Sequence, residues 1–239
     1  MNIIARSLAA FAYLVSSTLA HAGFVINPFF TTSPSITFLQ CAADVTDLTT
    51  YTFATQNTGT ASSDRYTLVG VTGEDDATAF TVSTVTVGGD SATELTEDAG
   101  AGVSINSAMY LVANTAGTSE EIVVTFSEAI TAAAICLWQV NNLTSGTAHD
   151  VASDTAAGGG AASLAMDFNA LGVGAAICGN TGDTNTFTWT GMTESSDADL
   201  GEHRVSSAEH TDTGAGETAR AIDCAPSGNS TAGSAVSLK

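Results

Sequence analysis

The sequence predicts an all-β protein, a β-sandwich or jelly-roll-like fold of roughly a dozen short antiparallel strands. Short runs rich in Val, Ile, Thr and aromatic residues recur along the chain and are separated by Gly, Asn, Asp and Ser clusters. Several of these runs alternate apolar and polar residues with the two-residue period of a strand. Beyond the N-terminal leader, no segment has the pattern of an amphipathic helix. The 239 residues suit one large β domain, since such folds often remain undivided at this length.

The strands expected in the first half are separated by turn residues. In the run Thr84-Val85-Thr86-Val87 the valines should lie on one face and the threonines on the other. The following Gly88-Gly89-Asp90 is typical of a hairpin turn, because glycine tolerates positive φ. The expected strands here are 36–39, 51–53, 66–71, 80–82, 85–87, 108–112, 122–126 and 135–140.

The second half continues the same pattern, and no tandem repeat is apparent. Gly158-Gly159-Gly160 is interpreted as a loop, because too few residues follow for a second domain. A single β-sandwich domain is therefore expected over residues 36–239. Its further strands are 163–168, 173–178, 186–189, 203–206, 219–222 and 235–238.

The N-terminus has the pattern of a secretory signal. A short basic start is followed by an apolar stretch over residues 7–20 and by Ala20-His21-Ala22, the small-x-small form of a cleavage site. Residues 1–22 are therefore expected to be a signal-like hydrophobic leader, either cleaved or retained, and residues 23–35 an N-terminal arm. The leader is short for a bilayer of about 30 Å, so no stable membrane span is expected.

Charge restricts the possible partners. The chain has 25 Asp and Glu against 5 Lys and Arg, a formal net charge of −20. Such a surface repels phosphates, which excludes general nucleic acid binding and anionic membranes. It favours solubility and cations.

Four cysteines, Cys41, Cys136, Cys178 and Cys224, lie far apart in the sequence. Their spacing does not match a zinc motif. After an export-like leader they suit two disulfides, with three possible pairings. Four buried thiols that act as small apolar side chains are the alternative.

No catalytic motif is present, so the chain is not expected to be an enzyme. It has no nucleophile elbow, no phosphate-binding loop and no His-Glu-x-x-His. The chain has four histidines, His21, His149, His203 and His210, and the pairs His149-Asp150 and Glu202-His203 place an acid beside an imidazole. Because adjacent strand residues point to opposite faces, these neighbours do not form dyads by default. No catalytic residues and no cofactor are therefore assigned.

Acidic residues in expected loops suggest calcium as a possible ligand. The candidates are Gly73-Glu74-Asp75-Asp76 and Asp197-Ala198-Asp199, and neither matches a defined calcium loop, so no metal ligands are assigned. Asp64-Arg65 is either a recognition contact or, the preferred interpretation, a structural ion pair or edge charge. The Thr and Ser ladders are either a sugar-facing surface or ordinary solvent-facing strand residues.

The middle of the chain resembles a known type of module. Residues 62–71, 80–89, 108–114 and 121–127 follow in an order that is similar to β-sandwich structural modules of marine bacteriophage virion proteins and related bacterial surface proteins. The resemblance extends over roughly residues 50–225 and implies a virion structural role, as a capsid decoration protein or a tail or fibre component. It implies protein–protein contacts on a virion surface and a homo-oligomer.

The export-like leader supports an alternative. An exported bacterial adhesin or carbohydrate-binding surface module, secreted and extracellular, would explain both the leader and the acidic loops on a β-sandwich.

Overall fold

The computed structural model describes residues 32–239 except 76–78, 100–103, 183–185, 201–202 and 227–228. The leader and residues 23–31 of the arm lie outside the described residues. The chain from Ser33 to Lys239 is one compact unit. Within the described part no helix is long and apolar enough to cross a membrane.

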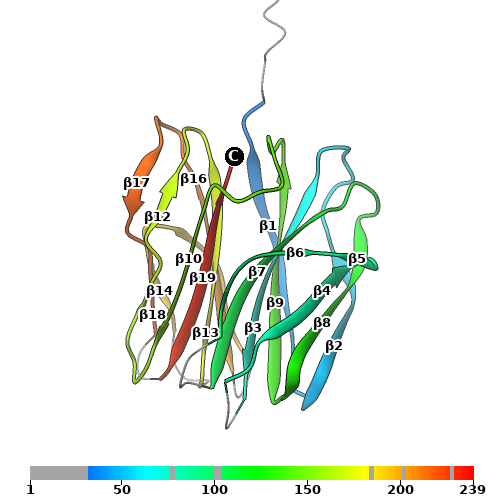
Figure 1. The fold of residues 1–239 in the computed structure, drawn as a ribbon, viewed down its shortest axis with the longest axis vertical. Coiled ribbons are helices and arrows are strands. Elements are labelled where there is room, and N and C mark those ends of the chain that lie inside the picture. The colour runs from blue at the N-terminus through cyan, green and yellow to red at the C-terminus, as the bar shows by residue number, and fades with distance from the viewer. Residues whose placement is uncertain (1–31, 76–78, 100–103, 183–185, 201–202, 227–228) are drawn as a thin grey trace, which may run out of the picture. The chain divides into compact units, whose positions relative to one another are not determined.

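The all-β prediction is confirmed, with 19 strands and no helix among the described residues (Figure 1). The excess over a dozen comes partly from strands of two or three residues, which are too short to show a periodic pattern. The strands are β1 Ser35–Asp44, β2 Leu48–Asn57, β3 Tyr66–Glu74, β4 Val82–Val87, β5 Asp90–Ser91, β6 Thr93–Asp98, β7 Ile105–Ala113, β8 Ser119–Ile130, β9 Ala132–Asn141, β10 Asp150–Ala156, β11 Ala162–Ser163, β12 Met166–Phe168, β13 Val173–Asn180, β14 Thr188–Thr190, β15 Thr193–Asp199, β16 Arg204–Thr211, β17 Glu217–Arg220, β18 Asp223–Ala225 and β19 Thr231–Leu238.

The first nine strands form a jelly roll. Sheet A has the order β1-β9-β3-β7-β6, and sheet B has the order β2-β8-β4-β5. All pairings are antiparallel. The chain passes between the two sheets, so that β1, β9, β3 and β7 face β2, β8, β4 and β5. This is the arrangement of an eight-stranded jelly roll, with β6 added at the edge of sheet A.

The second half repeats this topology. Sheet C has the order β10-β19-β13-β16-β15, so each of its strands takes the place of β1, β9, β3, β7 and β6 in turn. Two small sheets, D (β11-β18-β14) and E (β12-β17), take the place of sheet B. Even an irregularity recurs, because the register of β6 shifts between Glu94 and Thr96 and that of β15 between Glu194 and Ser196. The sequence shows no tandem repeat, so this repeat is one of topology and is visible only in the structure.

Three apolar clusters show that the sheets are stacked in four layers. The first cluster joins sheets B and A, the second joins sheets A and C, and the third joins sheet C to sheets D and E. Sheets A and C are therefore covered on both faces, and every residue of β13 and β19 is buried. Burying one Val, Leu or Ile side chain contributes about 1.5–3 kcal/mol, so this double coverage is a large share of the stabilisation.

Small residues let the inner sheets approach each other. The equivalent central strands β3 and β13 face one another, and a Cβ added to Gly70 would lie 2.9 Å from Ile177 Cδ1. A Cβ added to Gly179 would lie 3.0 Å from Thr72 Cβ. The abundance of Gly and Ala in these strands follows from this close contact, because protein interiors are packed without spare volume.

Polar contacts also cross between sheets A and C. The hydroxyls of Ser107 and Ser234 lie 2.9 Å apart, and both residues are fully buried. At the edge, the backbone N–H of Phe38 in β1 donates to Glu209 Oε2 in β16 over 3.0 Å. Burial raises the pKa of Glu209, although the hydrogen bond from Phe38 acts in the opposite direction.

Each jelly roll contains one disulfide, which settles the open question of the cysteines in favour of bonded pairs. Cys41 and Cys136 are opposite each other in β1 and β9. Cys178 in β13 is bonded to Cys224 in β18, which ties sheet C to the outer sheet D. The bonds close loops with sequence separations of 95 and 46 residues, and such crosslinks destabilise the unfolded chain.

Gly70→Val should lower the free energy of unfolding by about 1–3 kcal/mol, because its methyl groups would collide with Ile177 between the layers. Urea unfolding of the disulfide-intact protein measures this. The double variant Gly70→Val/Ile177→Ala should lose less than the sum of its two single variants. Additive losses would show that the two layers do not meet at this point.

Glu209→Gln should raise the melting temperature at pH 7 and have a smaller effect near pH 4. Because the pKa of Glu209 is raised in the folded state, its ionisation destabilises the fold as pH rises from the ordinary glutamate value through the raised one. Glutamine removes this cost and can still accept the hydrogen bond from Phe38. Exposed Glu121→Gln makes the same change in net charge, and an equal pH-dependent gain there would contradict the prediction.

Candidate functional site

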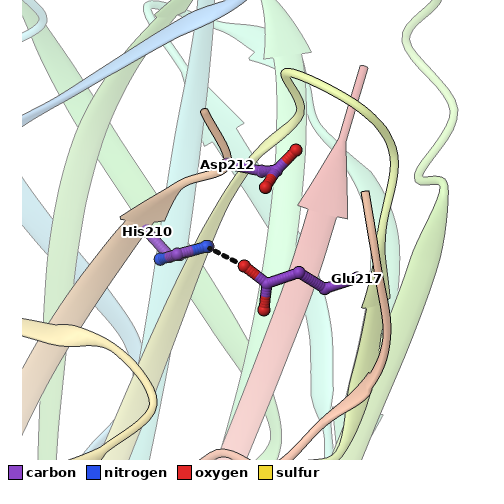
Figure 2. A group of neighbouring side chains, drawn as sticks. All are labelled: His210, Asp212 and Glu217. Carbon is purple, nitrogen blue, oxygen red and sulfur yellow. Dashed lines mark hydrogen bonds and ion pairs between the residues drawn. The ribbon is translucent and has the colours of Figure 1, made fainter. Parts of the chain in front are cut away.

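Three side chains with metal-binding groups meet at the turn between β16 and β17. His210 lies near the end of β16, Asp212 follows the strand, and Glu217 begins β17. One donor atom from each of the three lies within 4.8 Å of the others. Figure 2 shows the three side chains directed toward one another, with His210 Nε2 and Glu217 Oε1 3.3 Å apart. Among the described residues this is the group of His, Cys, Asp and Glu side chains close enough to share an ion.

Asp212 organises the turn. It is only 5% exposed, and its carboxylate accepts backbone N–H groups from Leu171 at 2.9 Å and from Gly214 and Gly216 at 3.2 Å. Gly216 has φ +92°, a conformation that favours glycine. Burial acts to raise the pKa of Asp212, but these hydrogen bonds and nearby His210 lower it below its ordinary value.

Glu217 and His210 are also fixed by neighbours. A hydrogen bond from Arg220 lowers the pKa of Glu217, with a smaller contribution from His210. The ring of Phe168 packs edge-on against His210, with centroids 4.8 Å apart. The turn therefore presents two ionised carboxylates and an oriented imidazole, a mixed nitrogen and oxygen set that suits a divalent cation.

The acidic segments that suggested calcium have other roles. Asp197 accepts from Arg204 Nε at 2.6 Å and from the backbone of Phe187 at 3.2 Å. Asp199 lies 4.0 Å from the same arginine. In the other segment, Glu74 faces His203, and Asp76 lies outside the described residues. The described members of the two segments are therefore not gathered into a calcium site.

Neither sequence-based interpretation of Asp64-Arg65 is right for the arginine. Arg65 is fully buried and donates to carbonyl oxygens of Asn114, Gly59, Ala116 and Gly117. Burial lowers its pKa. It is thus neither a recognition contact nor an edge charge, since its guanidinium fastens the loop after β7. Backbone carbonyls satisfy this buried cation.

His203 forms a polar joint between the two jelly rolls. Its Nε2 lies 2.8 Å from Thr72 Oγ1, and its Nδ1 lies 3.4 Å from Glu74 Oε2. The order hydroxyl, imidazole, carboxylate resembles a nucleophilic triad. Thr72 and His203 are both 0% exposed, however, so a substrate has no direct access to the hydroxyl. Glu202, the sequence neighbour of His203, lies outside the described residues, and His149 is exposed.

Sequence reasoning missed the β16–β17 turn as a site. A signal was present in the form His-x-Asp followed by Gly-x-Gly-Glu, because a tight turn there brings residues 210 and 217 together. The Thr72–His203 contact had no such signal, because 131 positions separate the two residues.

Comparisons with known proteins do not give a family. No protein-family model matches the chain, and no curated protein matches it. One similar solved structure is described as an anti-sigma factor domain-containing protein, with 11% sequence identity over 80% of this chain and 77% of that chain. Its TM-score of 0.22 is too low to support any argument about fold or function.

Proposed function

We propose that this protein is exported and binds a neutral, hydroxyl-rich surface, such as a polysaccharide, through the outer face of sheet B. The supporting observation is the arrangement of threonines on that face. In β2, β8 and β4 the inward residues are buried, so the alternate residues face outward. They align in two ranks across the strands, Thr50–Thr125–Thr84 and Thr52–Val123–Thr86.

These two ranks carry no charge, although the chain has 25 acidic residues. Along β8 the nearest outward carboxylate belongs to Glu121, one rank beyond Val123. Threonine offers a hydroxyl that both donates and accepts hydrogen bonds, beside a methyl group that can contact the apolar face of a sugar ring. The hydroxyls of Thr50 and Thr125 lie 3.3 Å apart, so neighbouring strands present them as one continuous surface.

Two further observations favour export. The N-terminal leader has the pattern of a secretory signal. Each jelly roll also contains a disulfide, and disulfides persist in oxidising compartments outside the reducing cytosol.

A virion structural protein is the second candidate function. Jelly rolls occur both in viral capsid proteins and in lectin domains, so the tandem jelly roll supports this candidate as well. The resemblance of roughly residues 50–225 to phage structural modules adds to it. Disulfides also occur on virion surfaces.

Thr84→Glu should weaken binding to an insoluble neutral polysaccharide at least about tenfold, because it places a hydrated charge within the uncharged ranks. Sedimentation with cellulose, chitin and agarose measures the bound fraction. Thr188→Glu, on an exposed residue of β14, is the matched control and should bind as the unchanged protein does. If the unchanged protein binds none of the three polymers, or if Thr84→Glu binds equally well, the threonines are simply solvent-facing strand residues.

Export can be tested on the native producer by intact-mass analysis of the culture medium and of purified virus particles. The proposed function predicts a secreted chain that begins at Gly23 and whose mass corresponds to two disulfides. A chain found only in particles would reject export in favour of the virion role.

A further inference from the structure

We infer that His210, Asp212 and Glu217 bind one transition-metal dication of the zinc type, with water completing its coordination. This inference does not rest on the proposed function, because the turn between β16 and β17 belongs to the second jelly roll and sheet B to the first.

The charge at the turn is incompletely balanced. Glu217 is paired with Arg220, whereas the hydrogen-bond donors to Asp212 are backbone N–H groups. Asp212 is only 5% exposed and points into the group (Figure 2). Buried carboxylates are usually paired with a cation or coordinate a metal. A bound dication would supply the charged partner that Asp212 lacks.

The spacing needs little adjustment. Two ligands on a tetrahedral zinc, each at about 2.0–2.1 Å, lie roughly 3.3–3.4 Å apart. His210 Nε2 and Glu217 Oε1 are already 3.3 Å apart. All three donor atoms lie within 4.8 Å of one another, so a shift of Asp212 inward by about an ångström would complete the set. The contact from Gly214 N to Asp212 Oδ1, at 3.2 Å, leaves that oxygen a lone pair for the metal.

The ligand chemistry selects zinc over calcium. Calcium takes six to eight oxygen ligands, whereas an imidazole with carboxylates suits zinc and its neighbours in the transition series. The groups around the ligands are also suitable. Phe168 restricts the ring of His210, and Arg220 holds the second oxygen of Glu217, so the donor atoms are oriented before a metal arrives.

Isothermal titration of the disulfide-intact protein with zinc chloride at pH 7, with excess calcium present, tests the inference. We expect one zinc per chain, and an affinity that falls as the pH is lowered, because metal ligands must lose their protons to bind. His210→Gln should weaken the affinity at least about tenfold. His149→Gln, on an exposed histidine, is the matched control and should have no effect.

A thermal melt of each variant without metal establishes that it folds. Glutamine at position 210 can keep a hydrogen bond to Glu217, so the variant should remain folded. The inference is overturned if zinc binding is not saturable at one per chain, or if His210→Gln binds zinc as tightly as the unchanged protein. It is also overturned if excess calcium abolishes zinc binding, because that outcome indicates a site made of oxygen ligands alone.

Discussion

The double coverage of sheets A and C is the constraint on which the rest of the structure depends. A central strand covered on both faces has no side for polar residues, so nearly all of its positions must be apolar or have an internal partner. Where two such sheets pack together, a large side chain in one sheet requires a small residue opposite it in the other. Ile177 of sheet C, for example, packs against Gly70 of sheet A. Two polar contacts cross between the layers there, Thr72 with His203 and Ser107 with Ser234.

Strands with one solvent-exposed face were easier to predict from the sequence than strands that are buried on both faces. In β4 the alternation of valine with threonine predicted both the strand and its orientation, because solvent on one side enforces a two-residue period. In β13 and β19 small apolar residues fill both sides, so the strands were predicted but their position between two layers was not. Strands as short as β5 and β11 follow from pairing with neighbours and leave no local pattern.

The duplication was hidden because equivalent positions carry different residues. The register aligns the row Cys41–Cys136–Gly70–Met109–Thr96 of sheet A with the row Ser153–Ser234–Ile177–Ser207–Ser196 of sheet C. Packing of one row against the other favours such differences, since a glycine in one makes room for an isoleucine in the other. The two halves therefore share a strand order, whereas the residues at equivalent positions differ. The candidate metal ligands, in contrast, lie within eight consecutive residues, 210–217, and were within reach of sequence reasoning.

The use of the arginines has a consequence for the resistance of the folded chain to proteolysis. Arg65 lies beneath the carbonyl groups that it binds, Arg204 is paired with Asp197, and Arg220 is bonded to Glu217. These are the basic residues between Ser33 and Val236, and each lies within or next to a strand. Digestive enzymes of the trypsin type cut after arginine or lysine and need an extended, accessible segment, so local unfolding must come first. The scarcity of basic residues that makes the surface so acidic thus also leaves such enzymes very few bonds to attack.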